Sequence, residues 1–329
     1  MRLLTIPTVG ILLLCVISPV SACDICGCPG AGSSPGLLPL VQRHFVGVRW
    51  QYQSYSIAAH HTGGSPTEET YHTADVWGRW QPHRRVQAIG ILPWSVAARI
   101  TPGEPVLQAV GIGDATVLLQ YSLLDPARQS VRVWQQALQA GAGVKIPTGS
   151  SNLTDKEGAL VAPNLQPGTG SADYMTSLLY AVRKGKTGIS LDVSARISTK
   201  NAAGYQFGHR LNAGLQGFLV LRSGKSTVIP SLGVMTDIRQ KDRDNDRIKG
   251  ETGGYTMSSA VSVQLFRGNW SLNLNGGVPV YHHMGNGLIK PRLQIGAGVA
   301  YLIGHRSNKV PQGIFKDVDG VSGVSNRQS

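Results

Sequence analysis

Three cysteines lie within six residues near the start of the chain, in the segment CDICGC: Cys23, Cys26 and Cys28. Thiolates at this spacing can wrap a soft ion such as Cu(I) or Zn(II). Two alternatives remain open. The small residues VSA at 20–22 fit a lipobox, in which Cys23 is acylated and becomes the mature N-terminus. In an oxidising compartment two of the thiols can instead form a disulfide.

A second set of metal-ligating side chains falls in two segments that the strand pattern places around loops. The set comprises His60, His61, His72, His282, His283 and Met284. If the last strand pairs with the first, these loops are neighbours at one rim. Imidazoles beside a thioether can collect copper or zinc. Loop histidines are more often simply solvated, and this alternative also stays open.

No spacing in the sequence pairs a serine, a histidine and an acidic residue as a hydrolytic triad requires. We therefore expect a protein that is not an enzyme. A hydrolase site built at the loop rim remains a remote alternative, which would need a serine and a histidine within hydrogen-bond distance.

The first 22 residues are typical of an export signal. Arg2 supplies the positive start, an apolar run covers residues 9–20, and small residues precede position 23. A membrane-spanning helix needs about 20 apolar residues, so this run is too short to be one. We predict an exported protein whose residues 23–38 form a cysteine-rich periplasmic segment.

The composition is glycine-rich and weakly charged. The chain has 329 residues, of which 41 are glycine and 15% are charged, with a formal net charge of +13. No change in composition marks a linker, so we expect one domain after the signal. The export signal argues against nucleic acid as a partner. A basic exported surface is better suited to lipid phosphates or an anionic solute.

Alternation of apolar and polar residues with period two recurs along the chain, which is the signature of β-strands. In residues 189–197, for example, Ile, Leu, Val, Ala and Ile alternate with Ser, Asp, Ser and Arg. We predict an all-β protein with about twelve strands, near residues 42–55, 70–82, 85–97, 112–123, 131–146, 171–183, 188–199, 208–222, 226–238, 255–266, 269–281 and 289–304. Pro93 and Pro230 fall inside two of them, and a bulge or an early strand end is expected there.

The connections between these segments alternate between long and short, which with an even strand number is typical of outer-membrane barrels. We predict a closed antiparallel transmembrane β-barrel over residues 39–304, because an unpaired strand edge is not tolerated in lipid. The polar faces of the strands would then line a lumen. Its predicted charged residues are Arg49, Arg79, Asp173, Arg183, Asp192, Arg196 and Arg210.

Three further segments carry a resemblance to a known family: GIGDATVLLQYSLL (111–124), GAGVKIPTGS (141–150) and LQPGTGSADYMTSLLYAV (165–182). In this order they resemble the outer-membrane transporter barrels of the phenol-degradation meta-pathway type. CDICGC, FGHRLNAGL and ETGGYTM resemble a branch that begins with a CDxCGC motif. The resemblance implies the barrel fold and transport, without catalytic residues. Such barrels usually end at an aromatic residue, whereas here residues 305–329 follow as a polar tail, which we predict to be disordered.

We therefore expect a barrel in the outer membrane of a Gram-negative bacterium that passes a small solute, with copper or zinc handling as the specific hypothesis. The expected partners are outer-membrane lipid, the solute or metal ion, and the barrel-assembly machinery. The alternative is a lipid-anchored scaffold or metal-binding barrel that transports nothing. A lumen packed shut would favour that alternative.

Overall fold

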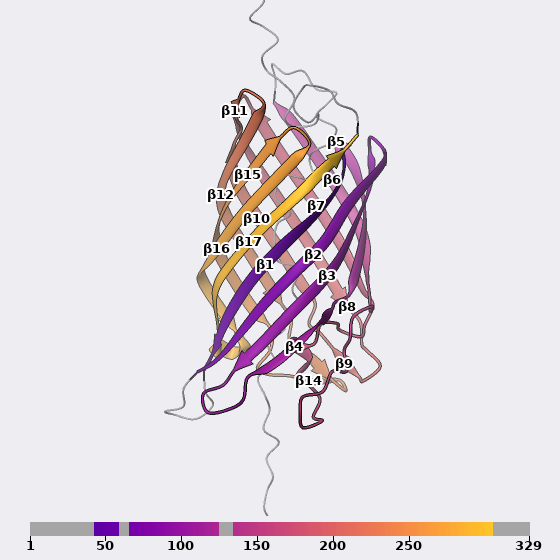
Figure 1. Cartoon of the computed structure of the whole chain (residues 1–329), viewed down its shortest axis with the longest axis vertical. Helices are drawn as coiled ribbons and strands as arrows, with labels where there is room; N and C mark the ends of the chain where they lie inside the picture. The colour runs from indigo at the N-terminus through magenta and orange to yellow at the C-terminus, as the bar shows by residue number, and fades with distance from the viewer. Residues whose placement is uncertain (1–42, 59–65, 125–133, 305–329) are drawn as a thin grey trace, which may run out of the picture.

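The structure is a computed structural model that describes residues 43–58, 66–124 and 134–304. It is an all-β barrel with strands steeply tilted to its long axis (Figure 1). The barrel strands are β1 His44–Ile57, β2 Thr67–His83, β3 Val86–Ile100, β4 Leu107–Ile112, β5 Ala115–Leu124, β6 Gln135–Ile146, β7 Asp173–Lys184, β8 Thr187–Ser198, β10 Arg210–Leu219, β11 Leu221–Ser223, β12 Ser226–Arg239, β15 Gly254–Arg267, β16 Trp270–Met284 and β17 Ile289–Ile303.

These strands form one continuous antiparallel ring. The first strand pairs with the last, from His44 opposite Ile303 to Ile57 opposite Ile289. The ring also closes between β10 and β12, so that the sheet is continuous around the barrel, while the short strands β4 and β11 each pair on one side only. Because β4 and β5 share one crossing of the wall, and β10 and β11 share another, the ring contains twelve crossings. The predicted closed twelve-strand barrel is confirmed.

Pro93 and Pro230, the two prolines for which an irregularity is predicted, interrupt the neighbouring strand rather than their own. β3 runs through Pro93 in unbroken register with β2, but its other neighbour is divided into β4 and β5 at that level. β12 likewise runs through Pro230, and its neighbour is divided into β10 and β11 there. A proline has no N–H to donate to the ladder on that side. The predicted irregularity is therefore present, displaced onto the partner strand.

The two ends of the barrel differ in the length of their connections. At what we call the short-turn end, two-residue turns join strands at 84–85, 185–186, 224–225 and 268–269, and the barrel begins and ends there. At the long-loop end, connections of up to 26 residues occupy 147–172 and others lie at 199–209 and 240–253. The short turns lie at the top of Figure 1 and the long loops at the bottom. The predicted asymmetry is confirmed.

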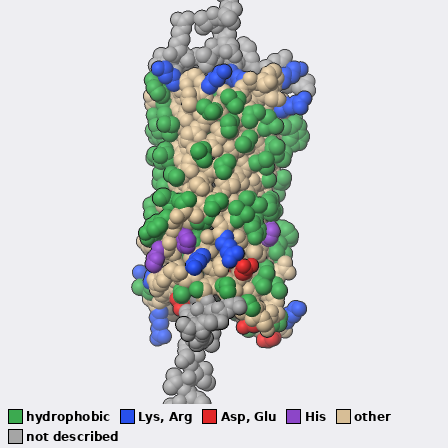
Figure 2. All heavy atoms as spheres, turned by 90° about the vertical axis from the view of Figure 1, so that its left-hand side faces the viewer, with side chains coloured by type: hydrophobic (Ala, Val, Ile, Leu, Met, Phe, Trp, Pro, Cys, Tyr) green, Lys and Arg blue, Asp and Glu red, His purple; other side chains and the backbone are tan. Residues whose placement is uncertain are grey.

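The outward-facing residues of the strands form an apolar surface. Figure 2 shows hydrophobic side chains over the middle of the barrel and Lys and Arg side chains gathered at the ends. Leu232 on β12 is 69% exposed, and Val46 and Val48 on β1 are also exposed, while the residues that alternate with them face the interior. A large exposed apolar surface of this kind is suited to lipid rather than to water.

Two belts of aromatic side chains border the apolar surface. Toward the long-loop end, His72 lies against Trp50 and Tyr52, with ring centroids 5.9 and 5.0 Å away. Toward the short-turn end, exposed Trp80 lies eight residues further along β2. Eight residues at about 3.3 Å each and a tilt of about 40° give a height of about 20 Å between the belts. This agrees with the apolar band of a membrane barrel.

A second, small sheet covers part of the long-loop end. It comprises β9 Tyr205–Gln206, β13 Arg243–Asp244 and β14 Arg247–Ile248, contributed by two loops that the sequence analysis left without structure. Asp242 anchors it, since its carboxylate accepts hydrogen bonds from the Tyr205 hydroxyl at 2.6 Å and from the Gly208 N–H at 2.7 Å. The loops at this end are therefore tied to one another.

Candidate functional site in the lumen

The structure places the seven predicted lumen charges on the inner face of the barrel. Arg79, Asp173, Arg183, Arg196 and Arg210 are buried, and Arg49 and Asp192 are half-buried. Most have a partner inside the barrel, such as the Arg49–Asp75 pair at 2.5 Å. Asp192 differs, since it has no hydrogen bond or ion pair among the described residues; a Cβ on its neighbour Gly214 would lie 2.6 Å from its Oδ1.

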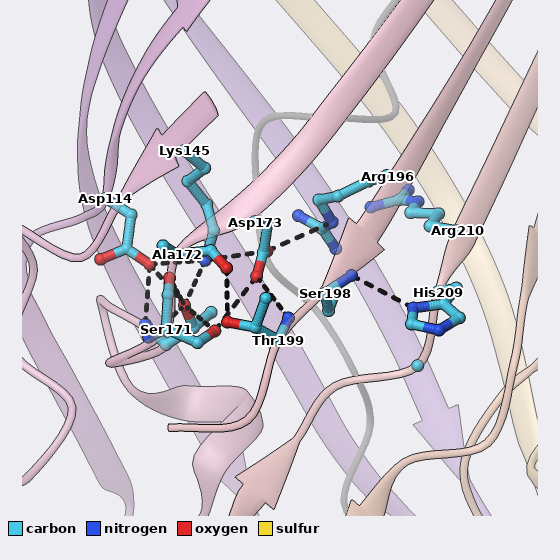
Figure 3. Close-up of polar contacts among 12 residues, drawn as sticks. Asp114, Lys145, Ser171, Ala172, Asp173, Arg196, Ser198, Thr199, His209 and Arg210 are labelled. Carbon is cyan, nitrogen blue, oxygen red and sulfur yellow. Dashed lines mark hydrogen bonds and ion pairs between the residues drawn. The ribbon is translucent and has the colours of Figure 1, made fainter. Parts of the chain in front are cut away.

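A charged network links three strands at the long-loop end (Figure 3). The Lys145 ammonium on β6 lies 2.8 Å from the Asp114 carboxylate and 3.0 Å from the Asp173 carboxylate on β7. Lys145 also contacts the Thr169 hydroxyl, which donates to Asp114 Oδ2 at 2.6 Å. Arg196 on β8 lies 3.8 Å from Asp173. All these side chains except Arg196 are less than 8% exposed. Each buried charge is therefore stabilised by the opposite charge beside it, and loss of one partner would leave the other uncompensated.

Local backbone features position this network. Asp114 lies at the break between β4 and β5, where its Oδ1 accepts a hydrogen bond from the Gly149 N–H at 3.1 Å. Gly149 and Gly168 pack backbone to backbone, since a Cβ on Gly168 would lie 2.4 Å from the Gly149 carbonyl carbon. Only glycine allows this approach. The 147–172 loop is therefore drawn back against the barrel wall.

The same loop enters the mouth of the barrel with a short 3₁₀ turn, Pro163–Leu165. The Asn164 amide donates to Glu69 Oε2 at 3.1 Å and to the Tyr71 hydroxyl at 2.9 Å. Arg99 donates to Glu69 Oε1 at 2.7 Å. Leu165 is 1% exposed and packs in an apolar cluster with Tyr55, Tyr71, Met284 and Ile289. The loop thus narrows the long-loop mouth with both apolar and charged contacts.

The lumen near the short-turn end is narrowed by apolar side chains. Phe45 and Trp77 meet edge to face with their ring centroids 4.5 Å apart. Phe218, Phe266 and Leu302 belong to the same buried cluster. Arg79 lies 5.0 Å above the Phe45 ring, which adds a cation–π contact to the cluster.

Cavities lie between these two layers. One has about 610 Å³ of empty space and is lined by inward residues of β10, β12, β15, β16, β17 and β1, among them Gln51 and Gln216. A second, of about 390 Å³, lies toward the long-loop end, where Arg210 and Arg239 hold Asp237 at 2.7 Å each. The interior is therefore not packed shut along its length.

The predicted metal ligands are not brought together among the described residues. His72 faces outward in the aromatic belt, His282 faces inward opposite Thr256, and His283 faces outward beside Tyr255. Met284 is buried and accepts from the Thr256 hydroxyl at 3.0 Å. Within the described part of the chain, no group of three or more His, Cys, Asp or Glu side chains could hold a metal ion. Cys23, Cys26, Cys28, His60 and His61 lie outside the described residues.

The sequence analysis missed two members of the charged network, Asp114 and Lys145. Both lie in the segments that carry the family resemblance, Asp114 in GIGDATV and Lys145 in GAGVKIP. Their signal was therefore present, and so was that of Thr169 and Asp173 in PGTGSAD. What the sequence does not show is that these separate segments converge on one set of ion pairs.

Comparison with solved structures agrees with the fold. The chain is similar to the COG4313 outer membrane channel from Pseudomonas putida F1, at a TM-score of 0.63 and 15% identity over 83% of this chain and 97% of that one. The β domain of the Bordetella autotransporter BrkA is more distant, at a TM-score of 0.47, 11% identity, and coverage of 79% and 100%. No family model matches the chain, and no curated protein matches it.

Proposed function

We propose that the protein is an outer-membrane channel for small solutes and not an enzyme. Its barrel is closed, its outer face is apolar between two aromatic belts, and its inner face is polar. In such proteins the long loops face the cell exterior and the short turns face the periplasm. The start of β1 and the end of β17 would then both lie on the periplasmic side, because both are at the short-turn end.

The observation that carries this proposal is the cavity inside the barrel, which is lined mainly by carboxamide and hydroxyl side chains. A barrel that served only as a scaffold has no need of open space bounded by polar side chains. The apolar cluster at one end and the 147–172 loop at the other narrow the path on both sides of this cavity. We infer a gated or restricted channel rather than a wide water-filled pore.

Conductance in planar lipid bilayers tests the channel. We expect the purified barrel to give discrete current steps. Ser258→Trp, which lines both cavities, should reduce the step size several-fold, because an indole would fill the lumen. Leu232→Trp on the exposed outer face should leave it unchanged. A folded barrel without current steps would contradict the channel and favour the scaffold alternative.

Metal handling is a narrower part of the proposal and depends on the cysteine spacing alone. We propose that Cys23, Cys26 and Cys28 bind Cu(I) or Zn(II) on the periplasmic side, in a segment that an export signal precedes. Intact-mass measurement of the exported protein, with and without each metal, reports acylation, disulfide formation and bound metal together. A disulfide or an acylated Cys23 without added metal mass would contradict the metal site.

A further inference from the structure

The larger cavity, which we call the chamber, occupies the middle of the lumen. Along β1, Phe45 belongs to the apolar cluster, Gln51 lines the chamber and Tyr55 belongs to the cluster at the long-loop mouth. Along β10 the same order appears in reverse, with Gln216 between Arg210 and Phe218. The chamber therefore separates a charged layer from an apolar layer.

The chamber lining contains no charged side chain. It consists mainly of carboxamides and hydroxyls, with a few apolar residues such as Met235 and Ala260. The charged groups nearest along these strands, Arg49 on β1 and Asp237 on β12, are already paired with Asp75 and with Arg210, respectively. A solute in the chamber consequently meets neutral donors and acceptors.

Several of these carboxamides have hydrogen-bonding capacity that the described part of the chain does not use. Asn273, Asn275 and Gln294 make no side-chain hydrogen bond to any described residue, and the Oδ1 of Asn273 is buried. A buried amide oxygen without a partner costs free energy that a bound hydroxyl would recover. The amides are thus available to a ligand rather than committed to one another.

Glycines opposite these amides keep the space open. In the β16–β17 register, Asn273 faces Gly298, Asn275 faces Gly296 and Gln294 faces Gly277. A Cβ on Gly296 would lie 2.8 Å from the Asn275 Oδ1, so that even alanine would displace the amide. Each amide therefore lies opposite a residue without a side chain, and the absence of a side chain at these glycines leaves the space unfilled.

We propose that the chamber binds an uncharged polyhydroxylated solute, such as a mono- or disaccharide, during passage. Hydroxyl groups can donate to amide oxygens and accept from amide nitrogens, whereas an ion would find no charged side chain in the chamber lining itself. An apolar solute would leave the amides desolvated and unpaired. The proposal rests on the channel function and names the solute of that channel.

The test measures entry of solutes of matched size into liposomes that contain the barrel. Glucose is compared with its charged analogues gluconate and glucosamine, and current steps are recorded on the same preparation with and without maltose. We expect glucose to enter at least tenfold faster than gluconate or glucosamine, and maltose to interrupt the current. Equal entry of all three solutes, with normal current steps, would overturn the chamber proposal while leaving the channel intact.

Substitutions in and near the chamber lining test whether the block by maltose arises in the chamber. Asn273→Leu replaces the amide by an apolar group of nearly equal volume. It should weaken the block of the current by maltose three- to tenfold, as the loss of one net hydrogen bond predicts. Gly296→Ala should weaken the block similarly by displacing Asn275. Leu274→Ala, on the outer face of the same strand, should change nothing. Unchanged block in both chamber variants would contradict the site. Maltose binding followed by tryptophan fluorescence, with no current steps, would support the chamber and contradict the channel.

Discussion

At the long-loop end of the lumen, contacts between charged groups predominate: Lys145 holds Asp114 and Asp173, and Arg99 holds Glu69. At the short-turn end, Phe45 packs on Trp77 within a cluster of apolar side chains. Charge pairs fix one arrangement of a loop but are costly to break, whereas apolar packing tolerates substitution of similar volume. The two ends should therefore respond differently to mutation and to salt.

The largest effect is expected from Lys145→Met. This substitution leaves two buried carboxylates without their ammonium, and such losses typically cost about 3–5 kcal/mol. We expect the free energy of unfolding in urea, measured in lipid vesicles, to fall by about that amount. Because the pair is buried, salt should alter the difference little. Lys145→Arg, which keeps the charge, should lose much less. Equal stability of Lys145→Met and the wild type would show that the network does not hold the loop.

A smaller effect is expected from Phe45→Leu at the opposite end. The substitution keeps an apolar side chain but removes the edge-to-face contact with Trp77 and the Arg79 contact above the ring. We expect a loss of about 1–2 kcal/mol by the same urea measurement. Val46→Leu, one residue along and facing outward, should have no effect. A loss at Phe45 as large as that at Lys145 would remove the proposed difference between the ends.

The smallest effect is expected outside the lumen, at the Lys200–Asp246 pair in the loops. Its atoms lie 2.8 Å apart, but the side chains are 42% and 74% exposed. The hydrogen bond and charge of Lys200 lower the pKa of Asp246 below its ordinary 3.8. Any contribution of the pair to stability is therefore present above about pH 4 and disappears as pH falls through the lowered pKa, and the exposure of both side chains keeps it small. Lys200→Ala should raise the pKa of Asp246 toward its ordinary value in an NMR titration, without a measurable change in stability at pH 7.

The fold could be predicted from the sequence because it depends on a local pattern. Alternation in segments such as 189–197 distinguishes inward from outward residues, and the lengths of the connections distinguish the two ends. The irregularities at Pro93 and Pro230 were also predictable. The strand that is interrupted was not, since it depends on which neighbouring strand would have accepted the hydrogen bond that proline cannot donate.

The site was less predictable because it depends on contacts between distant segments. Lys145 and Asp114 are 31 residues apart, and Asn164 reaches Glu69 across 95 residues. Nothing in the local sequence of the 147–172 loop shows that it enters the mouth. The position of His72 near a loop suggested a metal ligand, and the strand register that places its side chain outward beside Trp50 could not be seen in the local sequence.

The pairing of β1 with β17 joins the two ends of the barrel sequence along most of both strands. No shorter portion of the chain can complete the ring, since loss of either strand exposes two edges of unpaired N–H and C=O groups to lipid. A chain that lacks β17 therefore lacks the strand that closes the barrel. Closure of the barrel therefore requires its last fifteen residues, Ile289–Ile303. Without them we expect the preceding strands to aggregate rather than to form a membrane protein.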